Sequence, residues 1–165
     1  MDCNGMLNII IEGVAAAIRQ AFGSRYMIYT DEVRQGFKEP CFFILPISSE
    51  YTPFLNRRAQ YRSRLDIHYF PSGLNKNADR APERSPAAEP FSQSENADIS
   101  DVSEKLYLVL EFIKTEWGLI RGTSISEERV DGVLHFMVDY SVVIRREKDK
   151  DPYMEVLNIN ETVGK

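Results

Sequence analysis

Apolar residues recur at three- and four-residue spacing in two stretches of the chain, and this spacing predicts two amphipathic helices. The first covers residues 7–22 and is followed by Gly23, a residue that commonly ends a helix. Gly13 lies inside this helix, where it costs stability relative to alanine, so we expect it to mark close packing against a strand. The second helix is expected at residues 99–115. Its apolar stripe is Ile99, Val102, Leu106, Val109, Leu110 and Ile113.

Alternation of apolar and polar residues predicts strands. They are expected at residues 25–30, 41–49, 57–70, 119–129 and 133–146. The alternation is clearest at 57–70, where one face carries Tyr61, Ser63, Leu65, Ile67 and Tyr69 and the other carries Arg62, Arg64, Asp66 and His68. In the last strand Leu134, Phe136, Val138, Tyr140, Val142 and Ile144 share one face, and His135, Met137, Asp139 and Ser141 share the other. One buried and one solvated face is typical of an antiparallel sheet.

Turn residues and composition locate the connections. The pair Asp131-Gly132 predicts a two-residue hairpin. Pro46 predicts a bend or a sheet edge in the strand at 41–49, and residues 51–55 are expected to turn the chain. The segment 72–97 loses nearly all large apolar residues and predicts a mobile loop inserted in the domain.

The order helix, strands, helix, strands predicts an α+β fold. We expect an antiparallel sheet of about four to five strands, covered on one face by two helices. Residues 1–146 form a single domain with the inserted loop 72–97, and residues 147–165 form a C-terminal tail.

Charge and composition narrow the class of partner. The chain has 165 residues and a formal net charge of −5, which argues against specific binding of nucleic acid. The sequence shows no secretory signal and no apolar run of membrane-spanning length, so no membrane partner is expected. Cys3 and Cys41 are interpreted as free thiols in a reducing cytoplasm.

Sequence motifs give no reason to expect an enzyme. Neither a phosphate-binding glycine loop nor a GxSxG nucleophile elbow occurs, so catalytic and cofactor-binding residues are expected to be none. Glu127, Glu128 and Asp131 form an acidic group at the predicted hairpin, where carboxylates are usually solvated.

Two polar groups on the predicted solvated face have more specific alternatives. Asp66, His68, His135 and Asp139 could hold a metal if their strands were neighbours, but a polar sheet face is the favoured interpretation and no metal is expected. Arg57, Arg58, Arg62 and Arg64, with Tyr61 between them, could bind single-stranded nucleic acid. In an acidic protein we favour a contact surface for a neighbouring subunit or partner.

Several segments resemble a known family. The opening MLNIIIEGVAAAIRQAFGSRYMIYTDEVRQGFKEPCFFI, the strand end IHYFPS and the pair GLIRGTSIS and VDGVLHFMVDYSV are similar to a small family encoded by phages and prophage-like elements of Gram-positive bacteria. Its role is tail terminator, also called tail completion protein, of a long contractile tail. The resemblance covers residues 6–144 and departs at 79–96, which looks like an insertion.

The resemblance implies a structural virion protein. Tail terminators form a homo-oligomeric ring, typically a hexamer, on the last ring of the tail tube protein. They also contact the tail sheath protein and present a surface to the neck or collar. The resemblance therefore implies a site of action in the host cytoplasm during assembly, and then at the neck end of the virion tail or of a phage-tail-like bacteriocin. The arginine-bearing strand and the acidic hairpin offer opposite charges for two faces of such a ring.

Two other functions remain open from the sequence. The first is a head–tail connector or neck protein of the same particle. The second is a small host enzyme or ligand-binding domain, which would need a deep polar pocket that the sequence does not indicate.

Overall fold

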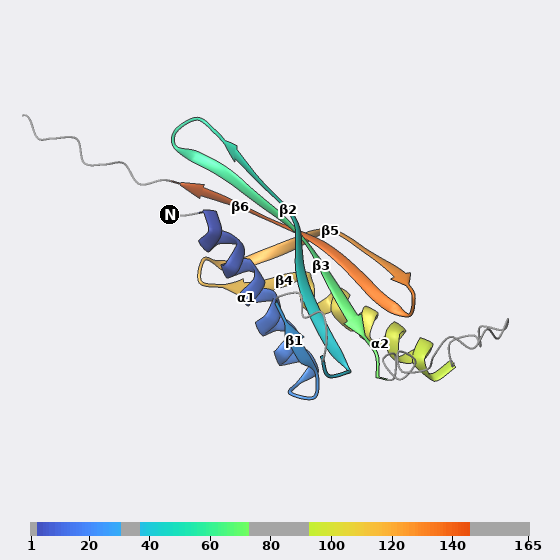
Figure 1. Ribbon diagram of the computed structural model, residues 1–165. Coiled ribbons are helices and arrows are strands. Elements are labelled where there is room, and N and C mark those ends of the chain that lie inside the picture. Colours follow the sequence, from blue (N-terminus) through green and yellow to red (C-terminus); the bar gives the residue numbers. More distant parts are fainter. Residues whose placement is uncertain (1–2, 31–36, 73–92, 146–165) are drawn as a thin grey trace, which may run out of the picture.

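The computed structural model of the chain describes residues 3–30, 37–72 and 93–145 (Figure 1). Over these ranges the chain forms helices and strands in the order that the sequence predicts, with one additional strand. The elements are α1 (Cys3–Phe22), β1 (Met27–Tyr29), β2 (Cys41–Pro53), β3 (Arg58–Phe70), α2 (Gln93–Leu110), β4 (Phe112–Thr115), β5 (Gly118–Val130) and β6 (Val133–Arg145).

The sheet is six-stranded and mixed, with strand order β1-β2-β3-β6-β5-β4. Only β1 and β2 among the described strands pair in parallel, and the other neighbours are antiparallel. The α+β class is confirmed, but the expectation of a purely antiparallel sheet of four to five strands is wrong. Side-chain alternation is the same in parallel and antiparallel strands, so it cannot give the direction of β1.

The additional strand, β4, lies where the sequence predicts the end of the second helix. Leu110 is the last residue of α2. Ile113 is buried as predicted, but it belongs to β4 and not to the helix. Ile113 follows Leu110 by three residues and therefore fits the helical stripe. The alternation exposed–buried–exposed over Phe112, Ile113 and Lys114 fits a strand equally well. A run this short does not distinguish the two periods.

The core lies between the helices and the inner face of the sheet. Leu106 of α2 and Phe136 of β6 are both fully buried, as their apolar stripes predict. Other members are Met6, Ile10, Val14 and Ile18 of α1, Val102 and Leu110 of α2, and Tyr61, Leu65, Ile67, Tyr69, Leu134, Val138 and Tyr140 of β3 and β6. By length and hydropathy alone the window Gly5–Phe22 could cross a membrane. The stripe that α1 buries against the sheet is what a core helix shows.

Two glycines permit close approach between elements. A Cβ atom at Gly13 would lie 2.9 Å from Cγ2 of Thr115, which confirms the expected packing of α1 against a strand. A Cβ atom at Gly122 would lie 2.5 Å from the carbonyl oxygen of Leu110. Glycine at these positions therefore lets α1 lie on β4 and lets β5 pass the end of α2.

A long hairpin of β2 and β3 projects beyond the helices at the upper left of Figure 1. We call residues 47–58 the arm. The register shifts between Pro46 and Ser48, which confirms the expected bend. The turn comes later than the predicted 51–55, because β2 continues to Pro53, and Asn56 and Arg57 adopt positive φ values of 61° and 58°. The second predicted hairpin is confirmed, with Asp131 and Gly132 both at positive φ.

The expected loop 72–97 is shorter than predicted, because α2 begins at Gln93. Its remaining residues 73–92 lie outside the described part of the chain, as do the whole C-terminal tail 147–165 and residues 31–36.

Candidate functional site

The outer face of β3 and β6 carries polar side chains that the helices do not cover. It is the face opposite the core, and we call it the open face. Its members in β3 are Arg62, Arg64, Asp66, His68 and Phe70, and those in β6 are His135, Met137, Asp139 and Ser141. These residues come together because β3 and β6 are neighbours, with His68 opposite His135 and Arg64 opposite Asp139.

Asp139 is held between two arginines. Its carboxylate accepts a hydrogen bond of 2.6 Å from Nε of Arg64 and another from Arg62. The Asp139 side chain is 1% exposed, whereas those of Arg62 and Arg64 are 46% and 44% exposed. The expectation that Asp139 is solvated is wrong, because the two long side chains on the neighbouring strand cover it.

The arginines also set the ionisation of Asp139. Burial by itself would raise the pKa of this carboxyl group, but the hydrogen bonds and positive charges of Arg64 and Arg62 outweigh it and hold the pKa below its usual range. The pKa of Arg64 is raised in turn by its hydrogen bond to Asp139. Asp139 is therefore a buried anion that fixes both guanidinium groups.

The four arginines that the sequence groups together, Arg57, Arg58, Arg62 and Arg64, have different surroundings in the structure. Arg62 and Arg64 direct donors to a carboxylate of their own chain, whereas Arg57 lies in the exposed turn of the arm and Arg58 at the start of β3. The four residues do not form one continuous patch of unpaired charge, and the contact role predicted for them stays a prediction.

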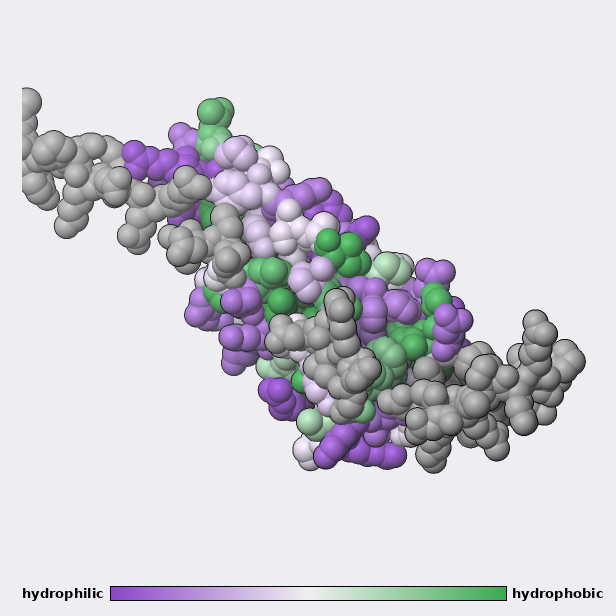
Figure 2. Space-filling view, viewed as in Figure 1, coloured by the Kyte–Doolittle hydropathy of each residue, from purple (hydrophilic) through white to green (hydrophobic). Residues whose placement is uncertain are grey.

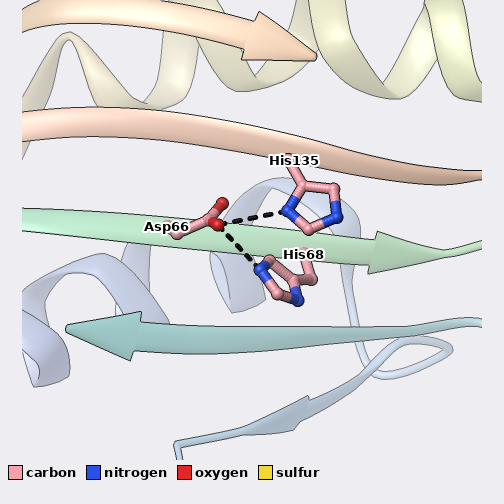
Figure 3. A group of neighbouring side chains, drawn as sticks. All are labelled: Asp66, His68 and His135. Carbon is pink, nitrogen blue, oxygen red and sulfur yellow. Dashed lines mark hydrogen bonds and ion pairs between the residues drawn. The ribbon is translucent and has the colours of Figure 1, made fainter. Parts of the chain in front are cut away.

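Asp66, His68 and His135 form a second polar cluster on the open face (Figure 3). Oδ2 of Asp66 lies 2.8 Å from Nε2 of His68 and 3.1 Å from Nδ1 of His135. The condition that the sequence set for these residues, that their strands be neighbours, is met. Asp139 does not belong to the cluster, since its carboxylate binds the arginines.

The charge of Asp66 also depends on its neighbours. Burial raises the pKa of its carboxyl group, but the hydrogen bonds and charges of His68 and His135 produce a net lowering. Its second oxygen, Oδ1, is buried and has no hydrogen-bond partner among the described residues.

An aromatic cluster that the sequence pattern does not predict lies at the end of the open face. The ring of Phe43 lies 4.9 Å from Tyr29, 5.3 Å from Phe37 and 5.3 Å from Phe70, measured between centroids. Phe43 and Phe70 alternate with core residues along their strands, so the sequence pattern places both on the solvated face. A large aromatic residue at such a position is the sequence signal that could have indicated this cluster. This end of the open face is therefore apolar.

Two exposed apolar surfaces are also not predicted by the sequence pattern. One is the tip of the arm, where Phe54 is 44% and Leu55 is 86% exposed, and Figure 2 shows hydrophobic colour at the end of this hairpin. The other is a hollow between α1, the end of α2 and the strands β4 and β5. Its lining includes Ala16, Ala17, Ala21, Val109, Phe112 and Leu119. Charged residues border both surfaces. Arg57 and Arg58 adjoin the tip in sequence, whereas Lys114 lines the hollow itself, and Glu12 and Glu116 line an adjoining hollow together with Lys114.

The acidic group near the second hairpin is divided between the two faces of β5. Glu127 accepts a hydrogen bond from Ser103 of α2, whereas Glu128 lies opposite His135 of the open face. Cys41 is a buried free thiol, as expected, and burial together with the charge of Glu39 raises its pKa to about 12. Such a thiol is a poor nucleophile and a poor metal ligand at neutral pH.

Comparison with known proteins gives one family. A protein-family model described as "Phage tail terminator protein" matches residues 9–83 and 89–152. The matched ranges contain the arm, both polar clusters and the apolar hollow. No curated protein matches the chain.

Proposed function

The chain belongs to a family of phage tail terminator proteins, and we propose that it closes into a ring that caps the tail tube. The family match is the observation that carries this function, and it places the protein among the structural proteins of the virion tail. The proposed ring has six copies, ends tube growth and presents a surface to the neck or collar. In a contractile tail it also contacts the last ring of the sheath.

Ring closure requires two different surfaces on each copy that fit one another. The arm tip and the hollow beside β4 are two such surfaces, because one projects and the other is recessed. Phe54 and Leu55 project from the tip, and the hollow is lined by small alanines and by the exposed side chains of Phe112 and Leu119. Burying exposed apolar area against a second apolar surface is the main driving force of association.

Charge supports the same pairing. Arg57 and Arg58 flank the tip, while two acidic residues, Glu12 and Glu116, and one basic residue, Lys114, border the hollow, and all five are exposed. The acidic residues outnumber the basic one on this surface. Opposite charges at the rim of an interface direct the encounter and suppress wrong orientations. We therefore place the arm of one copy on the α1–β4 surface of the next.

Charge reversal tests this pairing. Arg57→Glu with Arg58→Glu should leave the fold intact, since exposed charges contribute little to stability, and should weaken the ring. Glu12→Lys with Glu116→Lys should weaken it equally, and the fourfold variant should restore it. Light scattering after size exclusion measures the ring, and electron microscopy measures tail length in particles that carry each variant. Arg62 and Arg64 are unsuitable for this test, because their reversal would place carboxylates beside buried Asp139.

A matched pair of variants examines the other acidic surface. Glu128→Lys with Asp131→Lys changes the second hairpin, and we expect normal rings. If these substitutions break the ring and those at Glu12 and Glu116 do not, the arm contacts the hairpin instead. Overlong tails in particles without the protein would support a terminator, whereas tails of normal length that fail to join heads would support a head–tail connector.

A further inference from the structure

The cluster of Asp66, His68 and His135 has the chemistry of a metal site. Each residue offers one ligand atom, and these atoms all lie within 4.8 Å of one another. The geometry points to binding of one divalent transition metal ion, of which zinc is the representative, by these residues. Two imidazoles and one carboxylate suit zinc, nickel or copper better than magnesium or calcium, which prefer ligand sets made of oxygen atoms.

The spacing of the ligand atoms requires little rearrangement. In a tetrahedral zinc site with bonds of about 2.0–2.1 Å, neighbouring ligand atoms lie about 3.3 Å apart. The ring nitrogens of His68 and His135 lie 2.8 and 3.1 Å from Oδ2 of Asp66. Both imidazoles already direct a nitrogen toward the same carboxylate, as Figure 3 shows.

A second observation concerns the other oxygen of Asp66. Oδ1 is buried, yet no described residue provides a hydrogen bond to it. A buried carboxylate oxygen without a partner is costly, and a cation bound at the carboxylate would compensate for it. The two histidines therefore provide hydrogen bonds to only one of the two carboxylate oxygens of Asp66.

The sheet holds the ligands and leaves one side accessible. His68 and His135 are register partners on adjacent strands, so the backbone fixes their separation. The side chains of Asp66, His68 and His135 are 16%, 19% and 27% exposed. An ion can therefore enter from the open face, where a water molecule completes its coordination.

Titration of the tag-free protein with zinc alone tests the site. The chain has two histidines, both in this cluster, so histidine signals in the NMR spectrum report on it directly. The background variant Cys3→Ser removes a competing thiol. We expect one ion per chain by calorimetry, a higher melting temperature, and shifts of both imidazole rings that are complete at about one equivalent.

Substitutions sharpen the test. His68→Gln and His135→Gln should each weaken zinc binding at least about tenfold, because even the loss of a group that only hydrogen-bonds a metal ligand typically lowers metal affinity by about 10–100-fold. Glu128→Gln, which changes a nearby exposed carboxylate on β5, should bind zinc as the background protein does. Unchanged imidazole signals at one equivalent of zinc, or equal affinity in the histidine variants, would overturn the proposal. The NMR result does not depend on whether any histidine variant folds.

Discussion

At the scale of single residues, the charge of Asp139 holds the open face together. Two guanidinium groups lie on the same strand, two residues apart, and would repel each other without the carboxylate between them. Hydrogen bonds to charged groups contribute more to stability than neutral ones. The pair of arginines and Asp139 therefore acts as one unit across β3 and β6.

Asp139→Asn should lower the free energy of unfolding at pH 7 by about 1–3 kcal/mol, because the amide cannot carry the charge that both arginines bind. Urea denaturation measures the change. The control is Asp131→Asn in the exposed hairpin turn, where asparagine also tolerates the positive φ of 51°. We expect a change below about 0.5 kcal/mol for this control.

Asp139 also allows a prediction of how the stability of the protein changes at low pH. The pKa of Asp139 is lowered in the folded protein, whereas in the unfolded chain it is about 3.9. The unfolded state therefore binds more protons in this range, so the stabilisation is complete above the unfolded pKa and is lost as pH falls through the folded pKa. The stability difference between wild type and Asp139→Asn should shrink from pH 5 toward pH 2. A difference that stays constant over this range would contradict the pairing.

At the scale of elements, the close approach of β5 to the end of α2 sets the position of the outer strands. The amide of Gly122 donates a hydrogen bond of 2.8 Å to the carbonyl oxygen of Glu111. A side chain at Gly122 would meet the Leu110 carbonyl oxygen and Cγ2 of Val138, at 2.5 and 2.9 Å. An added methyl group at Gly122 could not move away from these contacts, because the backbone of α2 lies on one side of it and the core strand β6 on the other.

Gly122→Ala should therefore destabilise the protein by about 1–3 kcal/mol, the usual cost of an added methyl group in a packed core. Thermal unfolding measures the change. Gly5→Ala in α1 is the control, since a Cβ atom there meets nothing within 4 Å and alanine favours a helix. Equal melting temperatures for the two variants would show that β5 can move away from α2.

At the scale of the whole molecule, the two faces of the sheet have different roles. Its inner face and the helices form the core, while its outer face presents an aromatic end, the histidine cluster and the arginine cluster in sequence along β3. The arm extends this sheet beyond the helices, and Figure 1 shows it projecting from the body. Such a projection places side chains far from the subunit's own core, where only another molecule can bury them.

The inserted segment is the largest part of the chain for which we predict no role in the core. Replacing residues 74–90 by a short Gly/Ser link should change the free energy of unfolding by less than about 2 kcal/mol, because closure entropy depends weakly on loop length. Residues 93–96 must be kept, since they form the first turn of α2. A variant that also lacks this turn should be less stable. Insoluble protein after replacement of residues 74–90 alone would show that the segment packs into the core.

The sequence by itself determined the class of the fold and most of its faces. The buried side of β3, the core role of Leu106 and Phe136, and the turn at Asp131-Gly132 all follow from local period or backbone preference. These features depend on residues close together in the chain, which is why a linear pattern contains them. The resemblance in four segments likewise indicated a phage tail terminator, and the family match confirms this family.

Tertiary structure alone decided which distant residues meet. The period of two puts Asp66, His68, His135 and Asp139 on one side of their strands, but only the register of β3 with β6 joins three of them and assigns Asp139 to the arginines. Burial of Asp139 likewise depends on long side chains from another strand. Parallel pairing of β1 and the strand at Ile113 were also settled by packing, because short runs satisfy helix and strand periods alike. Contacts between strands distant in sequence depend on register, and register is a property of the assembled sheet.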